Sequence, residues 1–172
     1  TTVTAQSGGT VTVGSGGAVA NVSGATTNIN AGTVNIDANS SIASTAGDVT
    51  LQGTSPGNAL SVNFTGANSS ISSVGGNVNF NQAASPGQIT VTGGPTNGVI
   101  TANAGAGNVL FNGGANAVQV NVRRIDGCIG GSGNPFNITV GDTTGTTAIG
   151  NLNLPGDIVV NSANDIVICG PL

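Results

Sequence analysis

Short apolar segments with a period of two residues recur along the whole chain, and this repetition limits the fold more than any other feature. Each segment alternates apolar and polar residues and is flanked by glycine, asparagine or serine, which favour turns. The clearest examples are GTVTV at 9–13, GTVNI at 32–36, GDVTL at 47–51, GNVNF at 76–80, GQITV at 87–91, GNVLF at 107–111, FNITV at 136–140 and GNLNL at 150–154. The pattern predicts many short β-strands joined by turns.

A longer period relates these segments to one another. Segments 35–51 and 63–80 both contain a strand, the motif A-N-S-S-I, a glycine turn and a second strand, and Ile42 and Ile71 are 29 residues apart. Similar steps predict three columns of stacked apolar residues. The first is Val13, Ile42, Ile71, Ile100, Ile129 and Ile158; the second is Val22, Val49, Val78, Val109, Ile138 and Ile166; the third is Val11, Val34, Val62, Ile89, Val120 and Leu152.

Three strand columns with a shared period predict an all-β fold, a right-handed parallel β-helix (β-solenoid). We expect about six coils of roughly 29 residues, with three short strands each. A two-sheet sandwich is the alternative for strands of this spacing, although a sandwich does not require the shared period. Residues 1–172 are expected to form a single β-solenoid domain, which is either complete or a segment or subunit of a longer filament.

The composition suits stacked coils. The chain has 30 Gly, 23 Asn, 21 Thr and 15 Ser among 172 residues, and 20 Val and 13 Ile dominate its apolar set. β-Branched residues favour strands, whereas Gly and Asn weaken helices and supply positive φ at corners. With 5% charged residues and a mean hydropathy of +0.23, the chain does not resemble a disordered protein.

Outward polar residues between the apolar columns are expected to form ladders along the coil axis. In the third column these outward residues are Thr12, Asn35, Asn63, Thr90, Asn121 and Asn153. Polar side chains stacked in register can hydrogen-bond to their equivalents one coil away, as asparagine ladders do in cross-β assemblies.

Most residue types used in enzyme and cofactor sites are absent. The chain has no His, Lys, Glu, Tyr, Trp or Met, which excludes a His-based triad, a Lys Schiff base and a His-containing metal site. No calcium-loop motif occurs, and we expect no cofactor. Two arginines cannot neutralise a run of phosphates, so nucleic-acid binding is not expected. No apolar run is long enough for a transmembrane helix.

Aspartates are the remaining candidates for acid–base catalysis. β-Helical polysaccharide hydrolases use paired carboxylates, and the nearest pairs here are Asp37 with Asp48 and Asp157 with Asp165. Neither pair shares a position in the repeat, so we expect no catalytic residue and no enzyme. A polysaccharide-binding or -degrading module stays an alternative.

Ice binding is a second alternative, because flat threonine arrays on solenoids serve that function. T-x-T pairs occur at Thr10 and Thr12 and again at Thr90 and Thr92. Equivalent positions in other coils are often asparagine, so the regular threonine lattice is missing.

The two cysteines and the only two arginines provide the remaining candidate residues. Cys128 and Cys169 either form a disulfide that staples the C-terminal coils or are two separate small core residues, and an intermolecular pair is a third, minor option. Segment 123–135, RRIDGCIGGSGNP, interrupts the regular pattern and is expected to form an exposed loop that can contact a neighbouring subunit. The candidate contact residues are Arg123, Arg124 and Asp126.

Strings such as GGNVNFNQAASPG, GNVLFNGGANAV and LPGDIVVNSANDIVI resemble the repeats of large bacterial surface proteins of the filamentous-haemagglutinin and autotransporter-passenger type. The resemblance extends over the chain and carries no functional residue with it. It implies an exported right-handed β-helix that serves as a stalk, adhesin or matrix component. Members of that family are usually far longer, so this chain resembles a segment of one or a subunit that stacks.

These observations predict a non-enzymatic structural or adhesive protein that is extracellular or on the cell surface. A solenoid end exposes strand edges and core side chains, which must be covered. The expected partners are other copies of the chain in a head-to-tail homopolymer or adjoining parts of a longer surface protein.

Overall fold

The computed structural model describes residues 1–6, 8–54, 59–82, 87–94, 96–133, 135–140, 147–152, 158–161 and 166–168. Its strands form three parallel sheets. The eight-stranded sheet contains β1 (Thr2–Thr4), β4 (Thr27–Asn30), β7 (Val49–Gln52), β10 (Val78–Asn81), β13 (Asn108–Asn112), β16 (Cys128–Ser132), β18 (Thr147–Leu152) and β20 (Ile166–Ile168). The seven-stranded sheet contains β2 (Thr10–Val13), β5 (Thr33–Ile36), β8 (Leu60–Phe64), β11 (Ile89–Thr92), β14 (Val118–Val122), β17 (Phe136–Val140) and β19 (Ile158–Asn161). The five-stranded sheet contains β3 (Asn21–Gly24), β6 (Ser41–Ser44), β9 (Ser70–Ser73), β12 (Val99–Ala102) and β15 (Arg124–Asp126).

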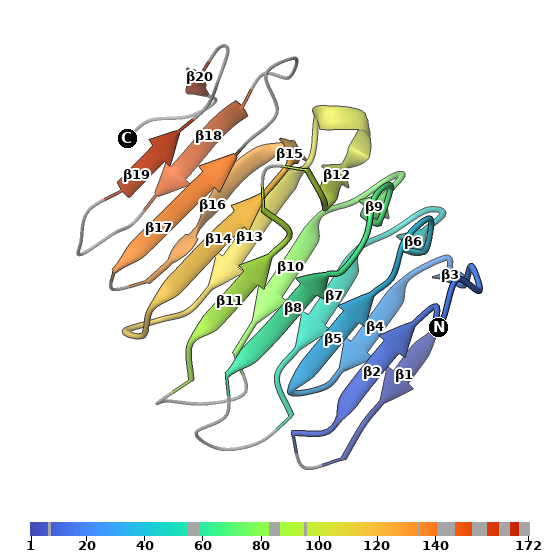
Figure 1. The fold of residues 1–172 in the computed structure, drawn as a ribbon. Helices are drawn as coiled ribbons and strands as arrows, with labels where there is room; N and C mark the ends of the chain where they lie inside the picture. Colours follow the sequence, from blue (N-terminus) through green and yellow to red (C-terminus); the bar gives the residue numbers. More distant parts are fainter. Residues whose placement is uncertain are drawn as a thin grey trace.

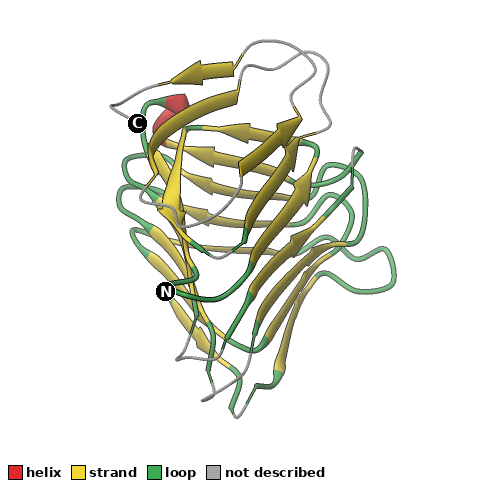
Figure 2. Ribbon diagram, turned by 90° about the vertical axis from the view of Figure 1, so that its left-hand side faces the viewer, coloured by secondary structure: helices red, strands yellow, loops and turns green. Residues whose placement is uncertain are grey.

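The chain visits the three sheets in rotation and advances by one strand in each sheet per coil (Figure 1). One short 3₁₀ helix, η1 (Asn103–Gly105), connects β12 to β13. Figure 2 shows the sheets as walls around a common interior. The expected parallel β-helix of about six coils is therefore confirmed, and the sandwich alternative is excluded because every ladder between the named strands is parallel.

The rotation changes after β15, which is the last strand of the five-stranded sheet. From β16 to β20 the described chain alternates between the other two sheets only. In the seven-stranded sheet, Leu60, Ile89 and Val118 are partners at equal steps along the sequence. The next partner, Phe136, follows Val118 after a much shorter step. Coils near the C-terminus are thus shorter and have two described strands each.

The first predicted column is correct in its centre and wrong at its ends, because the coils there are shorter. Ile42, Ile71 and Ile100 do stack at equal intervals along the sequence, as expected. The column then continues to Val22 on one side and Ile125 on the other, because the flanking coils are shorter. The remaining predicted members lie in other ladders: Val13 pairs with Ile36, Ile129 with Val109, and Ile158 with Phe136.

The second column is correct in the central coils and wrong outside them for the same reason, whereas the third column is wrong at Ile89 and at Leu152. The second column contains Val49, Val78 and Val109, and its ladder continues to Ile129 and Ile149. Two of its predicted members, Val22 and Ile138, lie in other sheets, and Ile166 pairs with Thr147. The third column is Val11, Val34, Val62, Val91, Val120, Ile138 and Val160, so Ile89 lies in the neighbouring column and Leu152 belongs to the eight-stranded sheet.

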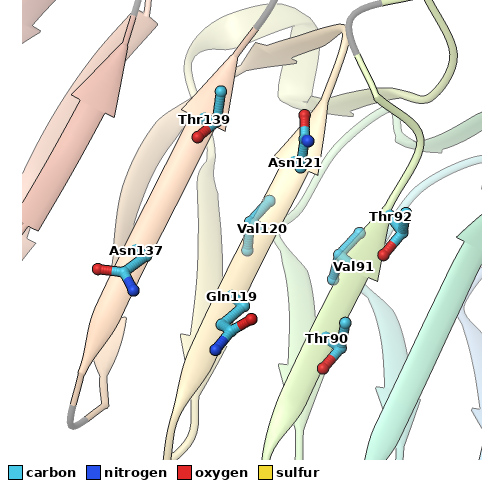
Figure 3. Close-up of a pocket in the computed structure, with 8 residues that line it drawn as sticks. All are labelled: Thr90, Val91, Thr92, Gln119, Val120, Asn121, Asn137 and Thr139. Atoms are coloured by element: carbon cyan, nitrogen blue, oxygen red, sulfur yellow. The ribbon is translucent and has the colours of Figure 1, made fainter.

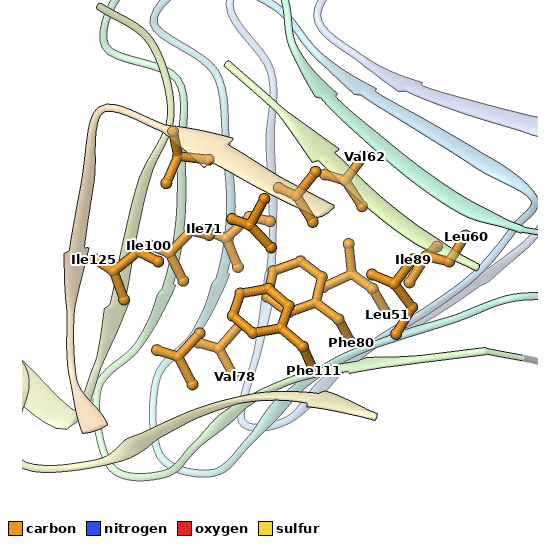
Figure 4. Close-up of a cluster of buried hydrophobic side chains, with 14 of the residues drawn as sticks. Leu51, Leu60, Val62, Ile71, Val78, Phe80, Ile89, Ile100, Phe111 and Ile125 are labelled. Carbon is orange, nitrogen blue, oxygen red and sulfur yellow. The ribbon is translucent and has the colours of Figure 1, made fainter. Parts of the chain in front are cut away.

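Stacked apolar side chains fill the interior (Figure 4). Ile71, Ile100 and Ile125 line one wall and are fully buried. Phe80 and Phe111 stack with ring centroids 4.8 Å apart and planes at 15°, and each such pair adds about 0.5–1.5 kcal/mol beyond the area that it buries. Burial of like side chains on one another therefore holds successive coils in register.

The A-N-S-S-I motif forms a corner between the seven- and five-stranded sheets. Asn39 and Asn68 both have a φ of 58°, a left-handed conformation that asparagine tolerates. The Asn68 amide donates to Oδ1 of Asn39 at 3.0 Å. Buried Ser69 donates to the carbonyl of Gly66 at 2.6 Å, which satisfies a polar group inside the corner. The motif recurs because coils of equal length place identical corners on top of each other.

Candidate functional site

The segment that was expected to be an exposed loop is part of the regular coil. Arg124–Asp126 form β15 and Cys128–Ser132 form β16, so the loop prediction is wrong. The segment looks irregular in sequence because Gly127, with a φ of 152°, connects the two strands directly and shortens the coil. Ile125 continues the buried column above Ile100, which explains why the segment is a strand.

Two of the three candidate contact residues, Arg124 and Asp126, lie on β15, the edge strand of the five-stranded sheet, and Arg123 directly precedes it. Nε of Arg124 donates to Oδ1 of Asp126 at 2.6 Å, and Oγ1 of Thr101 donates to Oδ2 of the same carboxylate at 3.3 Å. The amide of Arg123 donates to the carbonyl of Asn97 at 2.8 Å. Their contact with another subunit stays a prediction.

Cys128 begins β16 and is disulfide-bonded. Cys169, the expected partner, lies outside the described residues, so the pairing of the two stays a prediction.

Asp37 and Asp48 lie at different corners of the coil and hydrogen-bond to the following coil. Oδ1 of Asp37 accepts from Oγ1 of Thr65 at 2.5 Å. Oδ1 of Asp48 accepts from the backbone amide of Asn77 at 2.7 Å, and its Oδ2 accepts from the Asn79 amide at 3.3 Å. Both carboxylates thus connect coils. Asp157 and Asp165 lie outside the described residues, and no group of three potential metal ligands occurs within the described ones.

The outward face of the seven-stranded sheet carries two regular polar columns. Strand register places Thr10, Thr33, Ser61, Thr90, Gln119 and Asn137 in one column and Thr12, Asn35, Asn63, Thr92, Asn121 and Thr139 in the other. The expected ladder is confirmed at Asn63, whose amide donates to Oδ1 of Asn35 at 2.9 Å. Thr92 takes the place predicted for Thr90, and Asn153 lies outside the described residues.

A hollow of about 370 Å³ lies on this face over β11, β14 and β17 (Figure 3). The outward side chains that line it are Thr90, Thr92, Gln119, Asn121, Asn137 and Thr139. Val91 and Val120 have buried side chains, so the strand backbone at these positions forms the floor. We refer to the six outward side chains as the polar hollow. Sequence reasoning identified only Thr90 and Asn121 as ladder positions. Aligning the shortened coil would have added Asn137 and Thr139, and constant 29-residue steps from Ser61 and Asn63 would have added Gln119 and Thr92.

The N-terminal end of the solenoid is incompletely covered. β1, β2 and β3 are the terminal strands of their sheets, and one edge of each has no neighbouring strand in the described part of the chain. The side chains of Val3, Val11 and Val22 point toward the interior but are only partly buried, whereas their equivalents one coil further, such as Val34 and Ile42, are fully buried. This end therefore presents strand edges and apolar side chains together.

No protein-family model, curated protein or solved structure matches this chain. None of the helices in the described residues is long and apolar enough to cross a membrane.

Proposed function

We propose that the protein is a non-enzymatic, extracellular structural or adhesive rod that extends by end-to-end stacking of coils. The next coil comes from another copy in a head-to-tail homopolymer or from an adjoining part of a longer surface protein. The incomplete covering of the N-terminal coil carries this proposal.

Coil stacking elsewhere in the molecule shows what the N-terminal end lacks. Val34 lies between Val11 and Val62 and is fully buried, whereas Val11 has a neighbour on one side only and is partly exposed. A further coil would bury Val11 in the same way and pair the free edge of β2. Buried apolar area stabilises by about 25 cal/mol per Å², and the added strand pairs satisfy backbone groups at the same time.

Three further observations support an extracellular, non-catalytic role. Cys128 is disulfide-bonded, and disulfides persist in oxidising compartments. The carboxylates of Asp37 and Asp48 accept hydrogen bonds from the next coil, so they act as structural groups. The side chains that line the polar hollow include no nucleophile–base pair.

The stacking proposal is tested by changing the side chains at the exposed end. Val11→Lys would place a charge between stacking coils and should prevent assembly, because an unpaired charge in an apolar interface is costly. Thr12→Lys is the matched control, since Thr12 is on the same strand but points outward and is exposed. Analytical ultracentrifugation and electron microscopy of both variants and the unchanged chain report assembly directly.

We expect the unchanged chain and Thr12→Lys to form rods with an axial repeat of about 34–38 Å, because each chain adds seven to eight strand spacings along its two larger sheets. Val11→Lys should remain monomeric while keeping its β circular dichroism. A monodisperse monomer for the unchanged chain over a wide concentration range would contradict the head-to-tail polymer. Equal assembly of both lysine variants would show that the N-terminal end is not the contact.

A further inference from the structure

Side chains of the polar hollow leave their hydrogen-bonding groups unused by the protein. Elsewhere on the outer surface, asparagines bond along the axis: Asn112 to Asn81 at 2.7 Å and Asn116 to Gln82 at 2.8 Å. In the hollow, none of the six side chains donates or accepts a hydrogen bond within the described residues. On the preceding strands of this sheet the outward columns include the Asn63–Asn35 ladder, and the described side chains of β11, β14 and β17 do not continue it.

These groups have the chemistry of a site for neutral hydroxyl-rich ligands. Threonine hydroxyls and the amides of asparagine and glutamine each both donate and accept hydrogen bonds, as sugar hydroxyls do. The outward residues of β11, β14 and β17 include no charged and no apolar side chain. These outward residues provide no positive charge for an acidic polymer or a nucleic acid, and no apolar or aromatic side chain that could anchor a protein partner.

The arrangement of these side chains favours a polysaccharide over ice as the ligand. Along one column of the hollow the side chains are Thr90, Gln119 and Asn137, which differ in length, so their oxygens do not form a flat lattice. A flexible sugar chain can follow such a surface because water fills the remaining gaps. Parallel strands repeat at about 4.8 Å, close to the advance of one sugar unit in an extended chain, so successive strands meet successive sugars.

From these observations we propose that the polar hollow binds a neutral polysaccharide chain lying along the solenoid axis across β11, β14 and β17. Binding to one hollow is weak, because no aromatic ring lines it to stack on a sugar. Repetition along a polymer or a filament raises the overall affinity through multivalency. The proposal depends on the fold and not on end-to-end stacking.

Affinity electrophoresis in native gels tests this proposal directly, since a net charge of −4 carries the chain toward the anode at neutral pH. Separate gels contain dextran, xylan, mannan, a mixed-linkage β-glucan or, as the acidic comparison, alginate. The test variant is Gln119→Ala/Asn121→Ala, which removes two amides from the hollow. The control is Asn28→Ala/Thr50→Ala, which removes two outward polar groups from the eight-stranded sheet. All substituted residues are at least partly exposed, so the fold should persist.

We expect at least one neutral polysaccharide to retard the unchanged chain and the control equally. The test variant should bind about tenfold more weakly, the effect of losing roughly 1.4 kcal/mol from two hydrogen bonds. Monomeric Val11→Lys should still be retarded by the same polysaccharide, although less than the assembled chain because each monomer presents a single hollow, and this separates the proposal from the stacking proposal. The proposal would be overturned by no retardation in any neutral polymer, by retardation in alginate alone, by an equal loss in the control, or by thermal hysteresis that disappears in the test variant. A lateral dimer lost only in the test variant would also overturn it, by assigning the hollow to contacts between copies.

Discussion

The central coils and the C-terminal coils use the same residue types but reach different cross-sections. From β5 to β14 each coil has three strands, and partners such as Val34, Val62 and Val91 follow one another at nearly constant steps. After β15 each described coil has two strands, and Ile129 follows its partner Val109 after a much shorter step. Equal coil length allows each side chain to stack on its equivalent, whereas a change in length requires a different way to fill the interior.

Phenylalanines mark the point where the cross-section changes. Phe80 stacks on Phe111, but the next position in this ladder is Gly131. Phe136, from the opposite sheet, packs edge-on against Phe111 with centroids 6.3 Å apart. Where the five-stranded sheet ends, the next ring packed against Phe111 thus comes from the seven-stranded sheet and not from the eight-stranded sheet. Phe111 therefore contacts Phe80 of its own sheet and Phe136 of the other.

Replacing Phe111 should therefore have the largest effect on stability. Phe111→Ala removes a fully buried ring that contacts both Phe80 and Phe136, and substitutions of this kind cost about 3–5 kcal/mol. Val11→Ala at the partly exposed N-terminal coil should cost about 1 kcal/mol or less. Urea unfolding followed by circular dichroism measures both. Equal losses would show that the ring is no more important than an end residue.

Replacing Gly131 should have the second-largest effect on stability, because the change in coil size depends on this glycine. Its φ is 135°, and a Cβ at this position would collide with the carbonyl oxygen of Phe111. Gly131→Ala should cost about 2–4 kcal/mol through backbone strain and displacement of the neighbouring strand. Gly94→Ala is the matched control, since Gly94 also has a positive φ of 66° but nothing within 4 Å, and it should cost about 1–2 kcal/mol. Similar melting temperatures for the two variants would contradict the packing argument.

The same comparison explains what sequence reasoning could and could not recover. The constant step correctly placed Ile42, Ile71 and Ile100, because turns of equal length separate them. It failed at Ile129, since a direct turn at Gly127 shortens the coil and apolar periodicity does not report turn length. Part of the polar hollow was missed for the same reason: Asn137 lies beside Gln119, but the shortened coil brings it there earlier in the sequence than a constant step predicts.

Ser73 tests the central corners, where a smaller effect is expected. Its hydroxyl donates to the carbonyl of Gly47 at 2.8 Å and accepts from the amide of Gly76 at 2.8 Å, and the residue is 2% exposed. Ser73→Ala removes the acceptor of the Gly76 amide, whereas the Gly47 carbonyl keeps the Ser44 hydroxyl, and the change should cost about 1–3 kcal/mol. Ser72→Ala, at an outward position of the same strand, should change stability by less than about 0.5 kcal/mol. Equal free energies of unfolding for Ser73→Ala and Ser72→Ala would show that the buried corner hydroxyls do not stabilise the stacking of the coils.

Removing the ion pair on β15 should have the smallest effect on stability, although β15 is the last strand of the five-stranded sheet. The side chains of Arg124 and Asp126 are 41% and 21% exposed, and pairs at such sites contribute about 0.2–1 kcal/mol. Arg124→Ala should therefore lower stability by that amount at low salt and by almost nothing in about 1 M salt, where charges are screened within about 3 Å. Ile125→Ala, between the two charges in sequence but fully buried, should cost about 2–5 kcal/mol at any salt concentration. If Arg124→Ala were the more damaging change, electrostatics rather than burial would hold the last strand of the third sheet in place.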